Sequence, residues 1–164
     1  MDQISKKIKM ISEKLKELKN KFNLNEIDGY VVPKNDEYFS EFAKKDKLKT
    51  ITGFDGSFGI AIILKKKNFL FVDGRYVEQA KIQVGKKFKI LEIPKKLPYQ
   101  VLNSSLNLGF DPMIFTSRSL QYYFRGKIKL TPINKTMINS NTLNYHKSSK
   151  FYSLNTEIVG ETVK

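Results

Sequence analysis

Apolar residues recur every three or four positions over the first part of the chain, with Lys and Glu between them. This spacing places the apolar side chains on one face of a helix. We predict an amphipathic helix over residues 4–22 that packs on a core and ends at Asn23 and Asn25. A membrane-surface helix is the alternative, which the intermixed Glu13 and Glu17 disfavour. The apolar positions are Ile4, Ile8, Ile11, Leu15, Leu18 and Phe22.

Beyond residue 26, short apolar runs alternate with segments of helical spacing. The runs are rich in β-branched residues and are bounded by Pro, Gly or Asn, which is typical of strands. We predict strands within residues 27–33, 59–64, 68–73, 88–94, 106–112 and 127–133. We predict a loop with a short helix within 34–50, and further helices within 74–84, 98–106 and 116–126.

This alternation predicts an α/β layer fold in which helices cover a sheet. The strands at 59–64 and 68–73 are separated by three lysines and are expected to form a hairpin. From residue 134 the sequence loses periodicity and is rich in Asn, Ser and Thr. We therefore expect one domain over residues 1–133 and a tail or interdomain linker over 134–164.

The stretch TGFDGSFG, residues 52–59, has a glycine at every third position and raises the question of a phosphate-binding loop. Such a loop must lead into the N-terminus of a helix. The residues that follow, IAIIL, predict a buried strand instead, and the spacing fits neither GxGxxG nor GxxxxGK[ST]. We interpret Gly53, Gly56 and Gly59 as a structural turn, and place Asp73 and Gly74 at a second corner, between a strand and a helix.

The composition indicates the cellular compartment and excludes some classes of chemistry. The chain has no Cys, which agrees with a reducing compartment and excludes disulfides, thiolate nucleophiles and Cys-based zinc sites. No stretch approaches the roughly 18 apolar residues of a membrane span, and the N-terminus lacks the apolar segment of a signal peptide. We expect a cytoplasmic protein without a membrane partner.

The formal charge of +14 suggests a polyanion partner, because cations that neutralise phosphates dominate affinity for nucleic acid. However, Arg75, Arg118 and Arg125 are the only arginines, and the lysines are distributed along the chain. Arg is favoured for bidentate contacts to guanine and phosphate. Nucleic acid is therefore not expected as the main partner, although nonspecific attraction at low salt is.

Side chains for catalysis are scarce. His146 is the single histidine and lies in the predicted tail, so neither a His-based triad nor a metal site is expected. Asp55 and Asp73 are the best-placed acids, but Asp in turns mostly bonds its own backbone. Tyr122 and Tyr123 are interpreted as core and boundary residues. We predict no catalytic residue and no metal ligand in this chain.

Four stretches, taken in order, resemble one family: YVVPKNDEYFSEF, ITGFDGSFGIAII, FVDGRYVEQA and LGFDPMIFTSRSL. They are similar to the N-terminal domain of the creatinase/prolidase/aminopeptidase P family, in its three-domain Xaa-Pro aminopeptidase form. TGFDGSFG corresponds to the family's TGFxGSxG turn and DGRY to its strand-end motif. The resemblance runs from about residue 4 to 133 and implies a mixed β-sheet flanked by helices.

The resemblance implies a metallopeptidase, a hydrolase that removes the N-terminal residue preceding a proline. In that family two divalent metals, typically manganese, are held by two Asp, one His and two Glu of a C-terminal domain. The resemblance places that domain outside this chain, in cis or as a separate chain. We therefore expect this chain alone to bind no cofactor and to be inactive in proteolysis.

The resemblance also implies a role in substrate access, because the family's N-terminal domain closes over the catalytic cleft. Arg75 of the DGR motif resembles a residue that lines the substrate entrance, and an ion pair with Asp73 is its structural alternative. Asp55 and Tyr76 are weaker candidates. A stand-alone basic module that binds an acidic protein or nucleic acid is the alternative function. Main dimer contacts in the family belong to the catalytic domain, so we expect a monomer.

Overall fold

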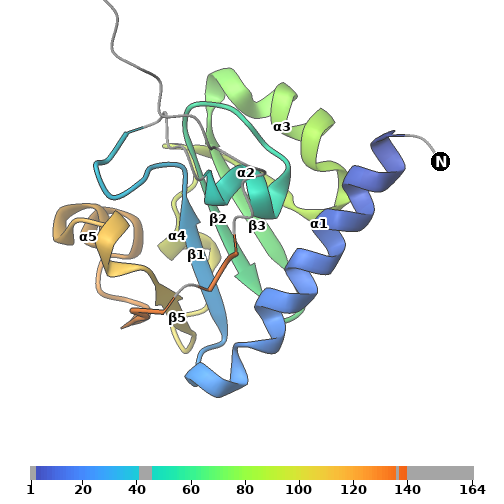
Figure 1. Cartoon of the computed structure of the whole chain (residues 1–164). Coiled ribbons are helices and arrows are strands. Elements are labelled where there is room, and N and C mark those ends of the chain that lie inside the picture. Colours follow the sequence, from blue (N-terminus) through green and yellow to red (C-terminus); the bar gives the residue numbers. More distant parts are fainter. Residues whose placement is uncertain (1–2, 41–45, 136, 140–164) are drawn as a thin grey trace, which may run out of the picture.

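The chain folds around one six-stranded sheet, with strand order β4-β3-β2-β1-β5-β6. A computed structural model describes residues 3–40, 46–135 and 137–139. The strands are β1 (Gly29–Pro33), β2 (Gly59–Leu64), β3 (Asn68–Asp73), β4 (Lys89–Ile93), β5 (Asn107–Phe110) and β6 (Lys129–Pro132). The helices are α1 (Gln3–Asn20), α2 (Lys47–Thr52), α3 (Val77–Val84), α4 (Pro98–Val101) and α5 (Ser117–Phe124). Figure 1 shows their arrangement.

The sheet is mixed because β2 runs antiparallel to both of its neighbours, whereas the other pairs are parallel. β2 and β3 form the predicted hairpin at the predicted bounds, with Gly59 opposite Val72 and Ile63 opposite Asn68. The carboxyl ends of β1, β3, β4 and β5 therefore meet at one edge of the sheet, where β2 begins. The predicted mixed sheet flanked by helices is confirmed.

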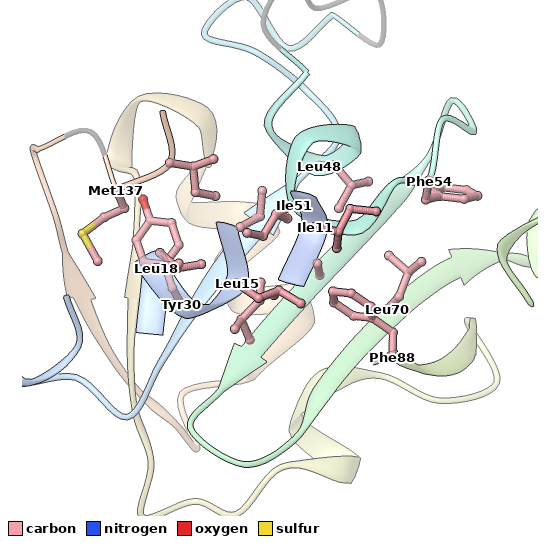
Figure 2. Packing of buried hydrophobic residues seen from close by; sticks show 14 of the residues in the cluster. Ile11, Leu15, Leu18, Tyr30, Leu48, Ile51, Phe54, Leu70, Phe88 and Met137 are labelled. Atoms are coloured by element: carbon pink, nitrogen blue, oxygen red, sulfur yellow. The ribbon is translucent and has the colours of Figure 1, made fainter. Parts of the chain in front are cut away.

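Alternating residues of the central strands supply two hydrophobic cores, one on each face, as the period of two in a strand requires. Tyr30 and Val32 of β1 face α1, α2 and α3, whereas Val31 faces α4 and α5. Figure 2 shows the first core, in which Ile11, Leu15 and Leu18 of α1 pack on the sheet. The predicted amphipathic helix is thus a core helix, and its apolar side is buried from Ile11 onward.

Packing continues past residue 133, the end of the predicted domain. Met137 and Ile138 are buried in the core that contains α1. Lys21, directly after α1, donates from Nζ to the Met137 carbonyl oxygen at 2.9 Å. The described residues just after β6 therefore pack on the sheet domain, while residues 140–164, including His146, lie outside the described ranges. The boundary at residue 133 stays a prediction.

Two differences from the predicted elements have local causes. The helix predicted within 98–106 is the single turn α4, because Leu102 is already extended with ψ 148°. In α5 the N-cap is Thr116, whose hydroxyl accepts from the Ser119 N–H at 3.1 Å. The helix ends at Phe124, within the predicted range, and its C-cap is Arg125, which is left-handed with φ 48°.

Among the described residues, no helix combines the length and apolar character needed to cross a membrane.

Candidate functional site: a groove at the carboxyl edge of the sheet

A groove of about 660 Å³ lies at the edge where the parallel strands end. In open α/β sheets, ligands bind in crevices outside the carboxyl ends of strands, because the loops there diverge. Segments that follow β1, β3, β4 and β5 and the start of β2 form its walls. The lining residues are Pro33, Lys34, Asn35, Phe39, Ser57, Phe58, Gly59, Ile60, Asp73, Arg75, Ile93, Pro94, Ile114, Phe115, Thr116, Ser119, Tyr122 and Tyr123.

Arg75 is the predicted entrance residue, and it lies on the groove wall directly after β3. Asp73 caps the 3-10 helix Gly74–Tyr76 by accepting from the Arg75 N–H at 2.9 Å. The Arg75 side chain bonds the same carboxylate, with Nε 3.0 Å from Oδ1. The structure therefore contains the ion pair that was the structural alternative, and it still leaves 74% of the Arg75 side chain exposed.

The Asp73 carboxylate is stabilised in its charged form by Arg75. The guanidinium bond and the Arg75 backbone N–H both stabilise the carboxylate, so the pKa of Asp73 is lowered from its ordinary value. At neutral pH Asp73 is therefore ionised, and its carboxylate orients the Arg75 guanidinium at the groove. A planar, delocalised Arg can bind carboxylate or carbonyl oxygens of a ligand while it keeps this bond.

The glycine turn, residues 52–59, forms the floor of the groove. Gly53 takes φ 81° at the end of α2, where its N–H donates to the Lys49 carbonyl at 2.8 Å. Gly56 lies against the Phe54 ring, so a Cβ there would overlap that ring. The predicted structural turn is therefore a corner folded over one buried aromatic ring, and it presents Ser57 and Gly59 to the groove.

On the opposite side, two polar contacts hold the loop that follows β1. The Lys34 ammonium pairs with Asp46, and both side chains are largely buried, with 11% and 16% exposed. Asn35 donates from Nδ2 to the Ile114 carbonyl at 2.8 Å, which joins this loop to the segment after β5. The Asn35 bond joins segments that are distant in sequence, whereas the Lys34 pair closes the connection between β1 and α2, and together they hold this wall of the groove.

Helix α5 contributes an aromatic wall through Tyr122 and Tyr123. The two rings meet edge to face, with centroids 5.1 Å apart. Burial, and then the neighbouring Tyr122, raise the pKa of Tyr123, so its hydroxyl remains protonated at neutral pH. Sequence reasoning interpreted this pair only as core and boundary residues. The signal available was their position on a helix that follows the β5 strand end.

The two weaker candidates, Asp55 and Tyr76, are not on the groove wall. Tyr76 lies behind it: its hydroxyl is 2.7 Å from the Ser57 Oγ, and its ring packs edge to face on Phe54 at 6.0 Å. Asp55 accepts from Gln83 Nε2 at 2.6 Å and from Gln79 Nε2 at 2.9 Å. These contacts tie the glycine turn to α3, and any role of either residue with substrate stays a prediction.

The contacts of Asp55 give a pH-dependent contribution to stability. The Gln83 hydrogen bond is the largest cause that lowers the pKa of Asp55, with Lys49 and Gln79 adding to it. A carboxylate with a lowered folded-state pKa stabilises above its unfolded pKa of about 3.9 and loses this contribution as pH falls further. We expect Gln83→Ala to raise the Asp55 pKa, measured by carboxyl ¹³C NMR titration. An unmoved titration midpoint would contradict this assignment.

In the described ranges, no group of three or more His, Asp and Glu side chains is placed to hold a metal ion.

The sequence of residues 14–138 matches the family model of the Creatinase/Prolidase N-terminal domain. The protein named "Probable Xaa-Pro aminopeptidase P" from Laccaria bicolor is 41% identical over 115 residues, which are 65% of this chain and 18% of that protein. The chain spans about a fifth of the length of the curated relatives it matches.

Solved structures agree on the fold. The cytosolic X-prolyl aminopeptidase with a di-nuclear active site from Caenorhabditis elegans matches with a TM-score of 0.66 and 22% identity. This match covers 77% of this chain and 24% of that one. The N-terminal domain of the cytoplasmic peptidase PepQ from Mycobacterium tuberculosis matches with a TM-score of 0.59 and 18% identity. It covers 74% of this chain and 92% of that one.

Proposed function

Because the chain belongs to the creatinase/prolidase N-terminal domain family, we propose that it is the non-catalytic N-terminal domain of an Xaa-Pro aminopeptidase. Such an enzyme removes the N-terminal residue that precedes a proline. One observation carries the proposal: the match takes up most of this chain but only about a fifth of its curated relatives. Most of a relative's length is thus available for other domains, and we assign catalysis to those.

The proposal places the metal chemistry in the catalytic domain. Two divalent ions, with manganese expected, would activate water and polarise the peptide carbonyl there. The chain would act beside that domain, either in cis or as a separate chain, and would meet the peptide only in the assembled enzyme. The description of the Caenorhabditis elegans relative as cytosolic with a di-nuclear site supports both the metal pair and a cytoplasmic location.

The groove supports a role in substrate access. It combines apolar and aromatic walls, from Phe39 to Tyr123, with one oriented guanidinium, Arg75. Binding sites for small ligands commonly have this composition, in which apolar walls give affinity and a few polar groups fix orientation. A peptide has both apolar side chains and carbonyl or carboxylate oxygens. We infer that the groove faces the peptide's path to the catalytic cleft and that Arg75 attracts its oxygens.

Substitution of Arg75 in the complete enzyme tests this role. Arg75→Ala removes the guanidinium but keeps the backbone N–H that Asp73 accepts from, so the corner can still form. We expect KM for an Xaa-Pro peptide to rise about tenfold with kcat nearly unchanged, as for lost uniform binding. Arg125→Ala, outside the groove lining, is the matched control. A KM for Arg75→Ala within twofold of the unmodified enzyme would refute the role.

A further inference from the structure

A second surface lies at the opposite edge of the sheet from the groove. Between β2 and β3 the chain turns through three consecutive lysines, all exposed. α1 and the segment after α3 bring further lysines to the same turn. We call this surface the basic ridge and define it as Lys16, Lys19, Lys65, Lys66, Lys67, Lys86 and Lys87.

Three hydrogen bonds hold the ridge together. Lys19 of α1 donates from Nζ to the Lys65 carbonyl at 3.2 Å, which places α1 beside the turn. Lys87 donates from Nζ to the hydroxyl of Ser12, which lies about two helical turns before Lys19 on α1. Asn68, just after the turn, donates from Nδ2 to the Lys87 carbonyl at 3.0 Å. Three segments distant in sequence therefore converge on one stretch of surface (Figure 1).

The helical period places Lys16 inside this surface. Ser12, Lys16 and Lys19 are separated by four and three residues, so they share one stripe of α1. Ser12 and Lys19 are about 10 Å apart along the axis at 1.5 Å per residue. Measured along the duplex axis, successive phosphates of one strand are about 3.4 Å apart. A stripe of this length laid along the duplex axis thus spans about three successive phosphates, and two of its residues, Lys16 and Lys19, are cations.

The charge of the ridge is not neutralised by the described part of the chain. None of its lysines forms an ion pair with a described acid. Glu17, the acid nearest in sequence to Lys16, instead pairs at 3.1 Å with Lys21, which follows α1. Burial lowers the pKa of Lys19, which is consistent with a side chain packed along the surface. Uncompensated like charges this close create a positive potential that attracts polyanions.

We propose that the basic ridge binds the phosphate backbone of nucleic acid without reading its sequence. Lysine binds phosphate as a point charge, and the ridge has no arginine for bidentate contacts to bases or phosphates, which fits binding without sequence readout. The ridge also contains no aromatic side chain for base stacking. A membrane surface fits less well, because the apolar face of α1 is buried in the core from Ile11 onward, which includes the part of α1 that carries Lys16 and Lys19. The proposal is independent of the peptidase role.

The test measures binding of a labelled oligothymidylate of roughly 20 nucleotides to the full chain by fluorescence anisotropy, across a salt titration. At about 0.15 M salt we expect a Kd on the order of 10 μM, in the range of nonspecific binding. If most ridge lysines contact phosphates, log Kobs should fall with log salt at a slope of about −4 to −5. No binding at about 0.15 M salt would overturn the proposal.

Two variants with equal changes in charge separate the ridge from net charge. Lys66→Gln/Lys67→Gln removes two exposed ridge lysines, and Lys95→Gln/Lys96→Gln removes two exposed lysines after β4. Loss of two phosphate contacts should weaken binding about tenfold at 0.15 M salt. The control pair should change Kd less than about twofold. Equal weakening by both pairs would assign the binding to net charge and overturn the proposal.

The other polyanions serve as competing outcomes in the same assay. Vesicles of phosphatidylserine and phosphatidylcholine test a lipid source of phosphate, and polyglutamate tests an acidic protein. We expect neither to displace the oligonucleotide at about 0.15 M salt. Displacement by vesicles or polyglutamate at an equal or lower concentration of charges would overturn the assignment to nucleic acid.

Discussion

Phe54→Ala is expected to lower the free energy of unfolding by about 3 to 5 kcal/mol, the cost of removing a buried aromatic ring and leaving a cavity. Phe54 is 0% exposed at the centre of the glycine turn. Its ring supports Tyr76 at a centroid distance of 6.0 Å, and Gly56 lies directly on it. The ring thus holds up the floor of the groove, so its loss affects both stability and the site.

Urea unfolding followed by circular dichroism measures this effect. Phe39→Ala, which removes the same ring from a position that is 53% exposed, is the matched control and should cost about 0.5 kcal/mol or less. Phe54→Leu keeps most of the apolar volume and should cost less than about 1.5 kcal/mol, which allows a measurement if the alanine variant does not fold. A loss below about 1 kcal/mol for Phe54→Ala would contradict a supporting role for the ring.

Asp46→Ala is expected to cost about 3 kcal/mol, because Asp46 has two roles. It neutralises the largely buried Lys34 ammonium beside the groove. Its other oxygen, Oδ1, caps α2 by accepting from the Lys49 N–H at 2.8 Å. Breaking a buried pair leaves an uncompensated charge and costs up to about 3 to 5 kcal/mol, and a lost N-cap costs about 1 kcal/mol. The partial exposure of the pair places the total toward the lower end.

Asp46→Asn separates the two roles, because Asn keeps the capping oxygen but not the charge. We expect it to cost about 1 kcal/mol less than Asp46→Ala in urea unfolding. Glu78→Ala breaks the exposed Lys81 pair, whose side chains are 56% and 79% exposed, and should cost less than about 0.5 kcal/mol. If Asp46→Ala lowers the free energy of unfolding no more than Glu78→Ala does, the ion pair between Lys34 and Asp46 does not stabilise the groove wall.

Local patterns predict the elements of this fold well where the pattern is unambiguous. The runs at 59–64 and 68–73 are almost wholly apolar and are separated by three lysines, so both strands have the predicted bounds. Packing of single apolar residues is harder to predict. Met137 and Ile138 follow no periodicity, and only contact with α1 shows that they are buried.

The candidate site depends on long-range pairing, which explains what the sequence could not show. The DGR motif predicted Arg75 and its corner, because local motif and position coincide there. Lys34, Asn35 and Tyr122 come from other segments, and they meet Arg75 only because β1, β3 and β5 end at one edge. The order of the strands brings these residues together, and no local pattern in the sequence specifies that order.

The central claim is that this chain is the non-catalytic N-terminal domain of an Xaa-Pro aminopeptidase. The most direct test isolates the protein or complex that contains this chain from its native cells and assays its peptidase activity. An antibody raised against the purified chain would isolate it, and cleavage of an Xaa-Pro peptide with added Mn²⁺ would be measured. The account predicts Mn²⁺-dependent, proline-directed cleavage by the isolated material, with the catalytic part fused or bound, and none by the purified chain alone. Isolated material without this cleavage, or equal cleavage by the chain alone, would contradict it.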